Sequence, residues 1–157
     1  MKAYHPIIGG ILAAALPIPQ IAGYRFDVAA NLSDVAARQR LSPAAIKAFL
    51  RIAQKWGVRD MASRELLGGI SSGSFYSLKK GPARRVLDQD ALTRISLLIG
   101  IFKALNILYS QRLADAWMTL PNSNPIFRGA TPLDYILRMG LPGMIHLRQL
   151  LDARRGA

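Results

Sequence analysis

Residues 62–80, ASRELLGGISSGSFYSLKK, decide the fold of this chain. A short apolar-periodic segment ends at Leu67, and the pair Gly68-Gly69 that follows it favours a tight turn. Phe75 and Leu78 then begin a second apolar stripe at helical spacing, behind a cluster of serines that can cap a helix. Two short helices joined by a glycine turn are typical of a helix-turn-helix, which we predict here.

The second of these helices is expected to present polar and basic side chains outward. Residues 71–87 hold four bases and no acid, and hydroxyl, phenol and ammonium groups suit contacts with base edges and phosphates. A basic face that is merely solvated is the alternative interpretation. The residues expected to contact DNA are Ser72, Ser74, Tyr76, Ser77, Lys79, Lys80, Arg84 and Arg85.

Helical periodicity continues on both sides of this motif. Before it, Ser42-Pro43 has the pattern of an N-cap followed by a first-turn proline, and predicts an amphipathic helix as far as Trp56. After it, Asp88 or Asp90 opens the longest periodic stretch, which we expect to be the central core helix. The single apolar stripe of that helix comprises Leu92, Ile95, Leu98, Ile99, Phe102, Leu105 and Leu108.

Three shorter helices are expected in the last third of the chain. One covers residues 113–118, and another begins at the cap and first-turn proline Thr131-Pro132 and stops at Gly140. The last begins near Pro142, and because it follows a glycine stop we expect it to project from the core into a partner. The alternative is that its leucines complete the core of the chain itself. No alternating strand of convincing length appears, so the predicted fold class is all-α.

The charge of the chain narrows the class of its partners. Lysine and arginine number 21 against 9 acids, a net charge of +12 on 157 residues, and such an excess favours polyanions through counterion release. Hydrophobic residues make up 51%, which excludes wholesale disorder. The absence of cysteine excludes disulfides and thiolate sites, and it is compatible with a reducing cytoplasm.

Groups suited to catalysis are sparse. Acid–base chemistry would have to draw on His5, His146, Glu65 and eight aspartates. His146 lies in a helical stretch without an acidic or histidine partner three or four residues later, so a structural role is expected for it. Phosphate-loop and dinucleotide glycine patterns are absent. We therefore predict that the protein is not an enzyme and has no catalytic residue, bound metal or cofactor.

The first 24 residues form an apolar stretch of a different kind. No charged residue occurs from Pro6 to Tyr24. A poorly ordered or partner-docked arm is the preferred interpretation, while a signal peptide cleaved near residues 13–15 and an over-extended start codon are the alternatives. Pro17 and Pro19 interrupt the stretch before it reaches the ~20 apolar residues that a bilayer requires, so no membrane span is expected.

A longer motif follows the core helix. Trp117, Pro121-Asn122, Phe127, Gly129 and Pro132-Leu133-Asp134 form the pattern W-x3-PN-x4-F-x-G-x2-PLD, preceded by RISLLIGIFKAL at residues 94–105. With the closing helix, these residues resemble the MbcA/ParS/Xre antitoxin family over roughly residues 41–157. Members of the family often carry Gly-Gly where this chain has Arg128-Gly129, so the geometry of that loop is expected to differ.

The resemblance implies a division of the chain and a function. It implies an Xre-like helix-turn-helix over residues 41–87 and a helical toxin-binding domain over 88–157, and it leaves residues 1–40 as an N-terminal arm to which no function is carried over. The function implied is that of a type II antitoxin, a cytoplasmic repressor of its own operon that blocks a RES-domain toxin, which consumes NAD. The implied partners are this toxin, operator DNA and a second copy of the chain in a larger complex, without a membrane.

The same resemblance points to residues at the toxin interface, for some of which a core position is the alternative. The residues expected to contact the toxin are Trp117, Asn122, Phe127, Arg128, Arg148, Leu151, Arg154 and Arg155. Two other functions compete with that of an antitoxin. A stand-alone helix-turn-helix transcriptional regulator would use the C-terminal part only to dimerise, and a secreted or membrane-associated protein is suggested by the N-terminal arm alone.

Overall fold

The computed structural model describes residues 31–81 and 85–156, and within these ranges it contains helices and no strand. The predicted all-α fold class is therefore confirmed. Residues 1–30 of the predicted arm and the predicted DNA contact Arg84 lie outside the described residues, whereas residues 35–40 of that arm belong to the first helix. The elements, in chain order, are α1 (Val35–Lys55), α2 (Asp60–Leu66), α3 (Ser72–Lys80), α4 (Gln89–Leu108), α5 (Gln111–Trp117), the 3-10 helix η3 (Pro125–Phe127), α6 (Pro132–Met139) and α7 (Leu141–Arg155).

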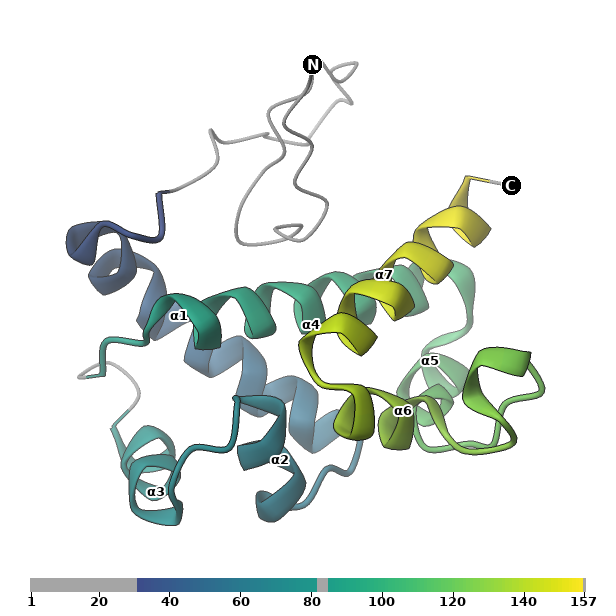
Figure 1. Ribbon diagram of the computed structural model, residues 1–157, viewed down its shortest axis with the longest axis horizontal. Helices are drawn as coiled ribbons and strands as arrows, with labels where there is room; N and C mark the ends of the chain where they lie inside the picture. The colour runs from purple at the N-terminus through teal and green to yellow at the C-terminus, as the bar shows by residue number, and fades with distance from the viewer. Residues whose placement is uncertain (1–30, 82–84, 157) are drawn as a thin grey trace.

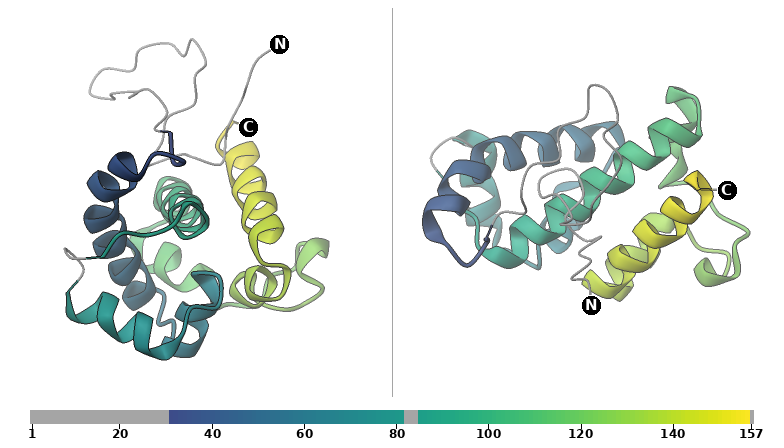
Figure 2. Two further views of the ribbon diagram at one scale, coloured as in Figure 1. Left: turned by 60° about the vertical axis from the view of Figure 1, so that its left-hand side comes forward. Right: turned by 90° about the horizontal axis from the view of Figure 1, so that it is seen from above.

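Helix α4 forms the centre of the molecule. It packs most extensively against α7 on one side and α1 on the other, and Figure 2 (left) shows it nearly end-on between these two helices. Its side chains from Leu92 to Leu105 join a single core with those of α1, α2, α3 and α7. The N-terminal and C-terminal halves of the chain therefore share one core built around one helix.

The burial of α4 corrects the prediction of a single apolar stripe. Leu97, Ile101 and Ala104, which lie outside the predicted stripe, are fully buried, whereas Ile99 and Phe102 within it are only partly covered. The reason is that α1 and α7 lie on different sides of α4, so the helix is covered on more than one face. The periodicity of apolar residues predicts a helix with one buried face, and it does not reveal the second buried face of α4.

The start of α1 corrects a second prediction. The helix begins at Val35 and is capped by Asp34, whose carboxylate accepts a hydrogen bond from the amide of Ala36. Ser42 is not an N-cap, and Pro43 lies inside the helix. The hydroxyl of Ser42 instead donates to the carbonyl of Arg38, which is the back-bonding that serine can make within a helix.

Three other caps predicted from sequence are confirmed. The Oγ of Ser71 accepts a hydrogen bond from the amide of Ser74 at the start of α3, at 3.1 Å. Asp88, rather than Asp90, caps α4, accepting from the amide of Ala91 at 2.8 Å. Thr131 caps α6 with proline in the next position. These caps hold because a short polar side chain satisfies amides that have no partner within the helix.

Among the described residues, α4 is also the one helix with the length and composition of a membrane span. More than half of its most apolar window, 56%, is buried inside the protein. Burial among the other helices accounts for its apolar sequence, because a helix covered on several sides needs apolar residues on several faces.

The fold separates two regions of the chain. Figure 1 shows α3 at one end of the molecule and the segment between α5 and α6 at the other, with α4 running between them. The predicted DNA contacts of α3 lie at the first end, and the predicted toxin contacts Asn122, Phe127 and Arg128 lie in the segment at the second.

Candidate functional site

The turn between α2 and α3 is held by a side chain of α2. The guanidinium of Arg64 donates through Nε to the carbonyl of Ile70 at 2.9 Å, and the amide of Gly69 donates to the backbone carbonyl of Arg64 at 2.9 Å. Gly68 and Gly69 have φ of +96° and +80°, which side-chain-bearing residues rarely adopt. The glycine turn predicted from sequence is thus present, and Arg64 adds a brace that the sequence reasoning missed.

The same turn rests on the first turns of α4. A Cβ atom at Gly68 would lie 2.9 Å from Oδ2 of Asp90 and 3.3 Å from Nε of Arg94. These two residues form an ion pair of 2.8 Å. The helix-turn-helix therefore approaches the central helix closely, and its turn has no room for a side chain on that side.

Helix α3 has one buried and one exposed face. Phe75 and Leu78 are 4% and 3% exposed and anchor it in the core, as the apolar stripe predicted. Ser74 is half-buried and takes part in the cap. The other predicted DNA contacts that the structure describes are exposed: Ser72, Tyr76, Ser77, Lys79, Lys80 and Arg85.

Two lysines of α3 lie over aromatic rings, and one of them is paired. The Nζ of Lys79 is 3.1 and 3.2 Å from the two carboxylate oxygens of Asp60, the first residue of α2, and 5.5 Å from the ring of Phe75. The Nζ of Lys80 is 6.0 Å from the ring of Tyr76. Both ammonium groups remain at the surface, so α3 presents positive charge together with a large exposed ring.

The opposite end is organised by a row of aromatic rings. Tyr109 stacks on Trp117 at 6.3 Å between ring centroids, Trp117 meets Phe127 edge-on at 6.1 Å, and Phe127 meets Tyr135 edge-on at 5.4 Å. Trp117 is 7% exposed and Phe127 is fully buried. These two predicted toxin contacts therefore lie in the core of the described conformation, where they support the surface from beneath.

The loop after α5 contains two further predicted contacts. Asn122 is half-buried, and its side chain accepts a hydrogen bond from the amide of Asn124 at 2.9 Å. Arg128 is exposed and has φ of +49°, followed by Gly129 at +80°. Both positions are left-handed, so the geometry suits the Gly-Gly of the resembling family, and Arg128 occupies a conformation that glycine adopts more easily.

Helix α7 does not project from the core, contrary to the prediction. Met144, Leu147 and Leu151 are fully buried, and the helix packs on α4. Leu151, a predicted toxin contact, therefore belongs to the core in this conformation. The exposed arginines of this helix come at its end, where Arg154 donates to the hydroxyl of Tyr109 at 3.1 Å and Arg155 lies 3.5 Å from a carboxylate oxygen of Asp152.

Arg148, the remaining predicted contact, fills a notch on α4. Its side chain is 13% exposed, and its Nε lies 2.8 Å from a carboxylate oxygen of Asp152. A Cβ atom at Gly100 would collide with Nη1 of Arg148. Because only glycine leaves this space, Gly100 and Arg148 together set how closely α7 approaches α4.

Exposed apolar side chains near the aromatic row were missed by sequence reasoning. Ile107, Leu113, Leu120 and Ile126 are 39–62% exposed. No signal in the sequence could separate them from neighbouring apolar residues that are buried, because exposure here depends on the tertiary packing of the segments that carry them.

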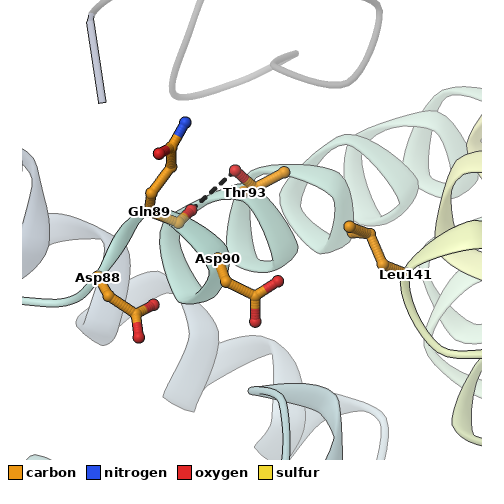
Figure 3. Close-up of a pocket in the computed structure, with 5 residues that line it drawn as sticks. All are labelled: Asp88, Gln89, Asp90, Thr93 and Leu141. Atoms are coloured by element: carbon orange, nitrogen blue, oxygen red, sulfur yellow. Dashed lines mark hydrogen bonds between the residues drawn. The ribbon is translucent and has the colours of Figure 1, made fainter. Parts of the chain in front are cut away.

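A shallow hollow lies where α4 begins. Asp88, Gln89, Asp90, Thr93 and Leu141 line it (Figure 3), and Thr93 donates to the carbonyl of Gln89 at 2.8 Å. Both carboxylates already act within the chain, one as the α4 cap and the other in the pair with Arg94. We therefore assign the hollow no catalytic role. Among the described residues, no group of three or more histidines and acids could hold a metal.

Comparison with known proteins matches both halves of the chain. Residues 35–100 match the model of the antitoxin Xre-like helix-turn-helix domain, and residues 104–156 match that of the antitoxin Xre/MbcA/ParS C-terminal toxin-binding domain. The chain is also 37% identical over 115 residues to the uncharacterized protein y4oB of Sinorhizobium fredii (strain NBRC 101917 / NGR234), covering 73% of this chain and 86% of that relative.

Proposed function

Because this chain belongs to the Xre/MbcA/ParS family of antitoxins, we propose that it neutralises a RES-domain toxin, which consumes NAD, and represses its own operon. The observation that carries this proposal is that both parts of the chain match antitoxin domains. Figure 1 places α3 at one end of the fold and the segment between α5 and α6 at the other. One chain then acts on two partners through surfaces that do not overlap.

The DNA-binding role is supported by the chemistry of α3. Phe75 and Leu78 hold the helix against the core, while Tyr76, Lys79 and Lys80 face outward. Ammonium groups bind phosphates and set the salt dependence, whereas hydroxyl and aromatic groups supply contacts with bases. Two copies of the chain would place two such helices on successive half-sites of an operator, in the manner of dimeric helix-turn-helix proteins.

The toxin-binding role is supported by the surface of the C-terminal half. Arg128, Arg154 and Arg155 are exposed, and guanidinium groups pair well with carboxylates in a cleft built for a cofactor. The RES class of the toxin follows from what this family usually neutralises. In this proposal the C-terminal helices cover the toxin's cleft and exclude its substrate, while the antitoxin itself performs no catalysis and acts in the cytoplasm, where its operator lies. In this proposal the DNA-binding part of the chain ends near residue 87, and the toxin-binding part begins with α4.

Co-expression with the neighbouring gene product tests the toxin-binding role. We expect that protein, expressed alone, to arrest growth and deplete NAD, and we expect co-expression of this chain to restore both and to yield a complex that co-purifies. A neighbouring protein that neither binds the chain nor affects growth would contradict the antitoxin proposal and leave the stand-alone regulator.

Charge removal tests the DNA-binding role. Replacing Lys79 and Lys80 with glutamine should weaken binding to the DNA upstream of the operon by about 10–100-fold at physiological salt and lower the salt slope by about one to two. Replacing Lys47 and Lys103, two exposed lysines of α1 and α4, with glutamine removes the same charge elsewhere. Equal losses for both pairs would mean that net charge, and not α3, determines binding; toxin neutralisation should survive in both variants.

A further inference from the structure

Exposed apolar side chains gather in one part of the chain. Of the nine large apolar residues exposed among the described residues, four lie between positions 107 and 126. Single exposed apolar residues are normal and need no explanation, so the question is whether these four form one surface. We call them the apolar corner: Ile107 at the end of α4, Leu113 in α5, Leu120 just after α5, and Ile126 in η3.

The aromatic row brings the apolar corner together. The rings of Tyr109, Trp117 and Phe127 follow one another at 6.3 and 6.1 Å, and each corner residue lies within four positions of one of these rings along the chain. Leu113 lies in α5 and Leu120 lies three residues after the end of that helix, so the two flank Trp117 along the chain. The ring contacts therefore hold together the segments that carry the corner residues, the end of α4, α5 and η3.

Basic side chains form the rim of the apolar corner. Arg112 and Arg128 are exposed, and Arg154 is fixed beside the row by its hydrogen bond to the Tyr109 hydroxyl at 3.1 Å. Two acids of this part of the chain are engaged within it, Asp115 with Lys55 at 3.8 Å and Asp152 with Arg148 at 2.8 Å. An apolar centre with a basic rim fits a partner whose apolar patch is bordered by carboxylates.

We infer that the toxin docks on the apolar corner, and that Trp117 and Phe127 act beneath it as supports. The inference rests on the proposed function and names the surface that carries it. The toxin is the occupant because the matched toxin-binding domain, residues 104–156, contains all four corner residues. The corner also lies at the opposite end of the molecule from α3 (Figure 1), so the toxin can cover it while α3 contacts DNA.

A pair of matched triple variants tests the inference. The corner variant carries Ile107→Gln, Leu113→Gln and Leu120→Gln, and the control carries Val35→Gln, Met61→Gln and Val86→Gln, three residues that are 49–75% exposed elsewhere. The probe is the purified product of the neighbouring gene. The corner variant should bind it at least about a hundredfold more weakly, and the control should bind it as the wild type does, while both keep operator affinity within about twofold.

The outcomes separate the surface from the proposed function. If the wild-type chain fails to bind the probe, the proposed function falls and the inference falls with it. If the wild type binds and the corner variant binds equally well, only the inference is overturned. If the wild type is a dimer and the corner variant is a monomer that still binds the probe, the corner is a contact between two copies of the chain. That result would also overturn the inference. Should the triple variant unfold by circular dichroism, Ile107→Gln and Leu120→Gln singly should each weaken binding about tenfold.

Discussion

Replacing Ser42 with alanine should destabilise the fold through a single buried amide. The hydroxyl of Ser42 is fully buried and accepts a hydrogen bond from the amide of Leu87 at 2.9 Å, joining α1 to the segment before α4. Alanine leaves that amide without its partner, a loss of about 1–3 kcal/mol. The better helix propensity of alanine offsets about 0.5 kcal/mol. We therefore expect the free energy of unfolding to fall by about 0.5–2.5 kcal/mol, which for a chain of this length lowers Tm by roughly 1–10 °C.

Chemical denaturation and amide exchange would test this prediction together. Denaturation gives the change in the free energy of unfolding, and hydrogen exchange reports the amide of Leu87 directly. Ser77→Ala, on the exposed face of α3, is the matched control and should change stability by less than about 0.5 kcal/mol. Stability within that range for Ser42→Ala, or unchanged protection of the Leu87 amide, would refute the reasoning.

Other substitutions test the close approaches described above. Gly69→Ala, where no atom would meet the new Cβ, should lower the free energy of unfolding by about 1 kcal/mol through its positive φ alone. Gly68→Ala should lower it further, because its Cβ meets the Asp90–Arg94 pair. Equal losses in chemical denaturation would contradict that contact. Gly100→Ala should lower the free energy of unfolding by about 1–3 kcal/mol despite the gain in helix propensity. Adding Arg148→Ala should recover part of that loss, because it removes the side chain that the new methyl group meets. Additive effects in the double-mutant cycle would contradict the contact between Gly100 and Arg148. Arg128→Gly should relieve the left-handed backbone and raise stability by about 0.5–1 kcal/mol, with a lower Tm as the contrary result.

Local chemistry made much of the fold readable from the sequence. The caps at Ser71, Asp88 and Thr131 and the turn at Gly68-Gly69 depend on a few neighbouring residues, and each was found where the pattern predicted it. The exposed face of α3 was predicted for the same reason, because Phe75 and Leu78 determine which face of the helix packs against the core. Caps and turns of this kind can be predicted from sequence because they do not depend on residues far away in the chain.

The predictions that the structure corrects concern positions where residues far away in the chain determine the contacts. Ser42-Pro43 has the local pattern of a helix start, but the buried amide of Leu87, 45 residues away, gives the hydroxyl a different partner. The predicted projecting helix was wrong because the end of the chain does not reveal that α7 lies against α4. The same packing buries Trp117, Phe127 and Leu151, three residues expected to contact the toxin; for Trp117 and Phe127 a core position was the alternative interpretation.

The sequence by itself determined the all-helical class, the helix-turn-helix with its basic second helix, and the family, since these depend on local spacing and on residues 62–80 and 117–134. Only the tertiary structure decided which apolar residues are surface. Helix α4 is apolar on several faces, and its coverage by α1 and α7 determines that Leu97 and Ile101 are buried while Ile107 is exposed. Hydrophobicity drives all of these side chains from water alike, and the space that remains after packing decides which of them are left for a partner.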